Sequence, residues 1–115
     1  MTTDWIRQTC MSFPNATEHV QWGNDLVFKI GGKMFAVAPL EPAGNRLSFK
    51  CSPEEFAELV ERPGIVPAPY LARAHWVALE TAGAIPLREC ATRLRRAYDL
   101  VLASLPRKVR SQLTQ

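Results

Sequence analysis

The sequence predicts an α+β fold: a two-layer domain with an antiparallel sheet of about five strands and helices packed on one face. Apolar and polar residues alternate over 26–30 and 47–51, the period of half-buried strands. Two glycines, Gly31-Gly32, separate two strand-like runs and predict a tight hairpin. Apolar residues recur at helical spacing from Pro86 to Leu105. The predicted order is a helix, three or four strands, a helix, one or two strands and a helix.

Length and charge are typical of one small globular domain. The chain has 115 residues and is 47% hydrophobic, which predicts a single domain over 1–115 with a basic tail at about 106–115. It has no apolar run long enough for a membrane span and no signal-peptide pattern, so we expect a cytoplasmic protein. The net charge is +3, but residues 1–60 carry −2 and residues 61–115 carry +5. A basic C-terminal half attracts polyanions.

The N-terminal elements follow from caps and turns. A helix is predicted over about 3–12, with Thr3 as its N-cap and Phe13-Pro14 as its end. Residues 17–22 are strand-like, and Gly23-Asn24-Asp25 predicts a turn. The strands 26–30 and 33–40 then flank the two glycines.

The second helix has the clearest start in the chain. Ser52 suits the N-cap, Pro53 suits the first turn, and Glu55 completes a capping box. The buried stripe is expected at Phe56, Leu59 and Val60. The four glutamates of this segment are then expected on its solvated face: Glu54, Glu55, Glu58 and Glu61.

The C-terminal half predicts two strands and a long helix. Prolines restrict 65–70 to a short edge strand at most, whereas 73–80 is predicted as a clean strand. The helix from Pro86 to about Leu105 has an apolar face that includes Leu87, and its arginines wrap the solvent face. Glu89–Arg93 and Arg95–Asp99 are spaced to form i,i+4 ion pairs.

No pattern for catalysis, metal or cofactor binding is present in the sequence. Cys10, Cys51 and Cys90 are far apart and odd in number, so we expect buried free thiols. His19 and His75 fall in separate strands, without metal-ligand spacing. There is no nucleophile elbow and no phosphate-binding loop. We therefore expect a non-enzymatic protein that uses no cofactor.

The predicted strand around Trp76 suggests a binding surface. His75, Val77 and Leu79 share one side, and Trp76 lies on the other. If helices cover the Val77 side, Trp76 lies on the open face of the sheet. Lys29, Arg46 and Lys50 would share that face. An aromatic ring among cations can stack on bases and contact phosphates; the alternative is that Trp76 is core and the cations merely face water.

The chain resembles the MmcQ/YjbR family over nearly its whole length. The matching segments, in order, are Gly32-Lys33-Met34-Phe35-Ala36, Leu47-Ser48-Phe49-Lys50-Cys51, Ser52-Pro53-Glu54-Glu55-Phe56, Pro67-Ala68-Pro69-Tyr70-Leu71, His75-Trp76-Val77-Ala78-Leu79, Tyr98-Asp99-Leu100-Val101 and Leu105-Pro106-Arg107-Lys108. The resemblance implies a compact antiparallel α+β fold of the α-β(3)-α-β(2)-α kind, similar to frataxin or to secretion chaperones. It also implies DNA binding, a function that rests on fold comparison.

The leading expectation is a small binding protein for DNA. Its candidate residues are Lys29, Lys33, Arg46, Lys50, Tyr70, Arg73 and Trp76, of which Lys33, Lys50, Tyr70 and Trp76 lie in segments that match the family. The alternative is a protein-interaction or chaperone-like module, which an exposed apolar patch around Trp76 would favour. A monomer or weak homodimer is expected.

Overall fold

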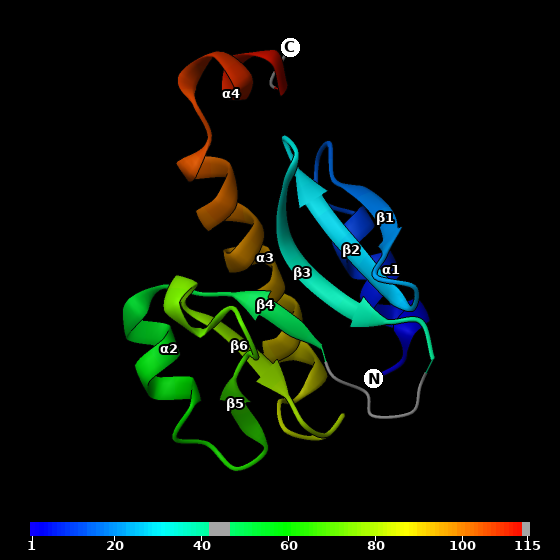
Figure 1. Ribbon diagram of the computed structural model, residues 1–115, viewed down its shortest axis with the longest axis vertical. Helices are drawn as coiled ribbons and strands as arrows, with labels where there is room; N and C mark the ends of the chain where they lie inside the picture. The colour runs from blue at the N-terminus through cyan, green and yellow to red at the C-terminus, as the bar shows by residue number, and fades with distance from the viewer. Residues whose placement is uncertain (42–46, 114–115) are drawn as a thin grey trace.

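The computed structural model describes residues 1–41 and 47–113. In these residues the chain forms six strands, four α-helices and one 3₁₀ turn (Figure 1). Their bounds are α1 Thr3–Met11, β1 Thr17–Gln21, β2 Asp25–Ile30, β3 Lys33–Pro39, β4 Ser48–Lys50, α2 Pro53–Leu59, β5 Ile65–Pro67, η1 Ala72–Ala74, β6 Trp76–Leu79, α3 Leu87–Ser104 and α4 Arg107–Leu113. The predicted α+β class is confirmed, with one strand more than expected.

The strands form one antiparallel sheet in the order β1-β2-β3-β4-β6-β5. The hairpin at Gly31-Gly32 is confirmed, and both glycines have positive φ, 59° and 84°. Between β2 and β3 the register skips Phe35, a β-bulge that lets Phe35 and Ala36 both reach the core. The short β5 is an edge strand, as its prolines predict.

The helices contribute to a core on one face of the sheet. Figure 1 shows α1 and α3 behind the strands, α2 beside β5 and β6, and α4 turned back at the end of α3. The main buried cluster joins Cys10 of α1, Leu59 of α2 and Leu94 of α3 to strand residues such as Phe28 and Phe49. The two-layer arrangement with helices on one face is therefore confirmed.

Two helix ends differ from prediction. The N-cap of α1 is Thr2, whose Oγ1 accepts from the Trp5 N–H at 3.0 Å, and not Thr3. Leu87, expected on the buried stripe of α3, is exposed at the first turn. The basic tail forms α4, whose partly buried Val109 and Leu113 pack against the core. No helix in the described part of the chain is long and apolar enough to cross a membrane.

The charged face of α2 also differs from prediction. The capping box between Ser52 and Glu55 is present, but Glu55 is buried, with 6% of its surface exposed. Its Oε2 accepts from Arg93 at 2.8 Å and from Arg96 at 3.0 Å. Arg93 also pairs with Glu58 and, as predicted, with Glu89. The helix therefore turns Glu55 toward α3 and not toward solvent.

The predicted strand over 73–80 is shorter in the structure. Residues Ala72–Ala74 form η1, and His75 has a left-handed backbone with φ 62°. Only Trp76–Leu79 is strand, β6. The residues 68–75 thus form a loop between β5 and β6, held by hydrogen bonds from the Ala68 N–H to the Trp76 carbonyl and from the Cys51 N–H to the His75 carbonyl, both 2.9 Å.

Candidate functional site

The face of the sheet opposite the main core carries the predicted cations and the indole. Cross-strand pairing aligns Lys29 with Met34 and Lys50 with Trp76. Because Val77, the neighbour of Trp76, lies in the core cluster, Trp76 points to the other side. The prediction that Lys29, Lys50 and Trp76 share a face is consistent with this register.

Trp76 is nevertheless not an accessible platform. Only 4% of its surface is exposed, and it forms a second, smaller cluster with Ala68 and Ala78. Met34, Val37, Val66 and Leu71 pack against this cluster. The loop between β5 and β6 covers the indole, so the expectation of an exposed ring is wrong for Trp76.

Beside this cluster lies a groove of about 510 Å³ on the same face. Trp22 and Asp25, at the turn between β1 and β2, line one side, and the loop residues Ala68–Leu71 line the other. Met34, Val37 and Ser48 of β3 and β4 complete the lining between them. We call it the open-face groove; the described residues of its lining are apolar except for Asp25 and Ser48.

Two aromatic residues stand at opposite sides of the groove in unusual backbone conformations. Trp22 has φ 53° and Tyr70 has φ 66°, a region that L residues with large side chains avoid. Trp22 is 66% exposed and Tyr70 is fully exposed. Neither ring is buried in the fold, and strained positions of this kind concentrate at functional sites. Sequence reasoning missed Trp22 because it was assigned to a strand; an aromatic directly before Gly23-Asn24 was the available signal.

Replacing these aromatics by asparagine is expected to keep the fold at least as stable. Asparagine tolerates the left-handed region, so Trp22→Asn and Tyr70→Asn should each leave the free energy of unfolding unchanged or raise it by up to about 1 kcal/mol. Urea denaturation measures this. The control Leu87→Asn removes an exposed apolar side chain from a helix and should cost about 0.5 kcal/mol. A loss above 1 kcal/mol in either groove variant would show that its ring supports the fold.

The remaining predicted cations are distributed around this face. Lys50 donates to the Ala74 carbonyl and so fastens the β5–β6 loop. Arg73 is exposed on η1 and Lys33 is exposed at the hairpin. Arg46 lies outside the described residues. The structure thus brings Tyr70 to the groove wall and leaves the cations Lys29, Lys33, Lys50 and Arg73 outside the groove lining.

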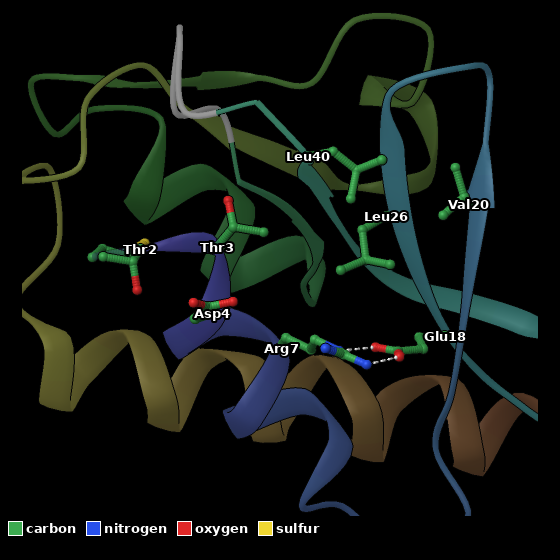
Figure 2. Close-up of a pocket in the computed structure, with 9 residues that line it drawn as sticks. Thr2, Thr3, Asp4, Arg7, Glu18, Val20, Leu26 and Leu40 are labelled. Carbon is green, nitrogen blue, oxygen red and sulfur yellow. Dashed lines mark hydrogen bonds and ion pairs between the residues drawn. The ribbon is translucent and has the colours of Figure 1, made fainter.

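A second hollow lies on the opposite side of the sheet (Figure 2). It has a volume of about 680 Å³ and is lined by residues 1–4 and Arg7, by Glu18 and Val20 of β1, and by Leu26 and Leu40. Figure 2 shows Arg7 and Glu18 facing one another across its lower edge, joined by hydrogen bonds of 2.6 and 2.7 Å. These bonds hold the pKa of Glu18 below its ordinary value. Arg7 and Glu18, two of the charged residues that line this hollow, are therefore paired with each other.

Potential metal ligands do not cluster in the part of the chain that the structure describes. No group of three or more potential metal ligands occurs in residues 1–41 and 47–113. The three cysteines are buried and free, as predicted. Burial raises the pKa of Cys51 to about 11 and that of Cys90 to about 12, so these thiols are poor nucleophiles.

These features define a small open-sheet α+β domain with a groove between two exposed aromatic residues. The chain belongs to the YjbR family, whose model matches residues 11–100. It is similar to the crystal structure of Deinococcus radiodurans protein DR2400, which carries the DUF419 domain, with 30% identity and a TM-score of 0.88 over 98% of this chain and 88% of that one.

A protein from Pseudomonas syringae has the same fold, with 19% identity and a TM-score of 0.74 over 88% of this chain and 99% of that one. No curated protein matches this chain. The resemblance to the YjbR family stated from the sequence is thus confirmed.

Proposed function

We propose that the protein is a non-enzymatic interaction module that holds an extended apolar segment of another protein in the open-face groove. The observation that carries this proposal is the pair Trp22 and Tyr70, exposed, strained and placed on opposite sides of one groove. Tryptophan and tyrosine dominate binding energy at protein interfaces. Met34, Val37 and Leu71 supply apolar surface between them.

DNA binding is the second candidate function. Single-stranded nucleic acid stacks on exposed aromatic rings, and Tyr70 is exposed, as is the cation Arg73 three residues further along the chain. Three features weigh against it as the first choice. Trp76 is buried, Lys50 is engaged with the Ala74 carbonyl, and the acidic Asp25 is the one charged residue among the described residues of the groove lining.

The test is selection of 12-residue peptides from a random phage library on the full chain. Selected peptides should be apolar, and their affinity should fall at least tenfold on the double variant Trp22→Asn/Tyr70→Asn while it is retained by Leu87→Asn. The oligonucleotide dT15 and a 15-base-pair duplex are titrated in parallel at low and high salt. Salt-sensitive binding of dT15 that depends on Trp22 and Tyr70, without groove-dependent peptides, would overturn the proposal in favour of nucleic acid.

A further inference from the structure

We infer that the open-face groove binds its peptide through one arginine, whose guanidinium lies against Trp22 and pairs with Asp25. Apolar side chains of the same peptide occupy the rest of the groove. This inference rests on the proposed function and adds the chemistry of the partner, which is an extended segment that is apolar apart from one basic side chain.

The first step is the charge of the groove. Asp25, at the start of β2, is half-buried, and no other described residue of the groove lining is charged. Within residues 1–41 and 47–113, no group forms a hydrogen bond or an ion pair with its carboxylate. A bound peptide displaces water from such a carboxylate, so the groove favours a peptide that brings a positive charge to it.

The second step is the aromatic ring beside this carboxylate. Trp22 and Asp25 are three residues apart at the turn between β1 and β2, and both line the same side of the groove. Tryptophan attracts cations more strongly than the other aromatic side chains, and arginine is the cation found most often over such rings. A guanidinium is planar, so its face can stack on the indole while its edge donates two hydrogen bonds to a carboxylate, whereas an ammonium group makes only a point contact.

The third step is the apolar remainder of the groove. Met34 and Val37 lie between the two aromatic residues, and the loop residues Ala68–Leu71 form the far side. The methylene groups of an arginine bury against apolar surface of this kind while the guanidinium stays at the carboxylate. The neighbouring side chains of the peptide then face Tyr70 and Leu71, where the described lining carries no charge, so these side chains are expected to be apolar.

The test starts from the phage-selected peptides whose affinity falls in Trp22→Asn/Tyr70→Asn. Arginine should be enriched in them over its frequency in the library, and aspartate and glutamate should be depleted. The tightest binder is resynthesised with arginine, citrulline or lysine at the selected position, because citrulline keeps the planar shape of arginine without its charge. Fluorescence anisotropy should give the arginine peptide an affinity about three- to tenfold higher than that of the citrulline peptide, with the lysine peptide between them. This difference should shrink as the salt concentration rises.

The variant Asp25→Asn gives the decisive comparison, because it removes the charge and keeps the size of the side chain. In this variant the arginine peptide should bind at most about twofold more tightly than the citrulline peptide, the part of the preference that the indole supplies. The matched control is Asp4→Asn, which removes the same charge from the hollow on the opposite side of the sheet and should keep the full preference.

The outcomes separate this inference from the proposed function. Groove-dependent peptides without arginine, or an arginine preference as large in Asp25→Asn as in the wild-type protein, would overturn the inference and keep the proposed function. A lysine peptide that binds as tightly as the arginine peptide would overturn the choice of a guanidinium. Selection of no peptide that depends on Trp22 and Tyr70 would overturn both.

Discussion

Replacing Trp76 by alanine is expected to lower the free energy of unfolding by about 3 kcal/mol or more. The indole is almost entirely buried, and its removal would leave a cavity lined by Ala68, Ala78 and Leu71. This second cluster supports the loop that forms one side of the groove, so the loop should lose order as well. Urea denaturation of the full chain, followed by circular dichroism, measures the loss.

The matched variant is Trp76→Phe, which keeps an aromatic ring in the cluster and should cost about half as much or less. The two variants separate two roles for Trp76. A surface stacking residue would change stability by less than about 0.5 kcal/mol on truncation. A small effect of Trp76→Ala on the free energy of unfolding would therefore support the prediction that Trp76 is an exposed stacking residue.

Strand periodicity predicted the face of Trp76 but not its burial. The alternation from Trp76 to Leu79 is a property of the strand itself, and it holds in β6. What covers a face depends on other parts of the chain. Here the loop that begins at Ala68 folds over the indole, and its path depends on the left-handed turn at His75 and on bonds to β4. The loop path, the turn at His75 and the bonds to β4 produce no periodic pattern in the sequence, so periodicity could not predict them.

The groove residues were predicted in part for a similar reason. Tyr70 was identified through the family resemblance. Trp22 was assigned to the strand before it, because tryptophan favours strands and disfavours positive φ. The structure places Trp22 in the left-handed region instead, against that local preference. Local preference fails most often at functional positions, which strengthens the case for a role of Trp22 in binding.

Helical periodicity predicted that Glu55 faces solvent, but Glu55 is buried in the structure. Its position on α2 was expected to face water, since charged residues are rarely buried without partners. The partners come from α3, a helix about forty residues further on: Arg93 and Arg96. The Ser52 backbone N–H also donates to the Glu55 carboxylate, at 3.2 Å. This contact was predictable as a capping box, but the ion pairs depend on how α2 and α3 pack.

Removing the Glu55 carboxylate is expected to destabilise the protein by about 2–3 kcal/mol. Glu55→Ala breaks the capping box and leaves the largely buried Arg93 with Glu58 and Glu89 as its ion-pair partners among the described residues. Glu58→Ala is the matched control, since it removes an exposed partner of the same arginine from the same helix and should cost less than 1 kcal/mol. Similar losses in the two variants would show that the burial of Glu55 contributes nothing to stability.

The same carboxylate should make stability fall in acid. Burial raises the pKa of Glu55, but the hydrogen bonds from Arg93, Ser52 and Arg96 outweigh burial and hold this pKa below its ordinary value of 4.5. Because the folded-state pKa is the lower one, the contribution of the ionised group is fully present well above pH 4.5 and is lost as the pH falls through the folded-state value. The measurement is the difference in unfolding free energy between the wild-type protein and Glu55→Gln from pH 7 to pH 3. We expect this difference to be constant down to about pH 5.5 and to narrow below pH 4.5; a difference that stays constant to pH 3 would mean that the Glu55 pKa is the same in the folded and unfolded chains.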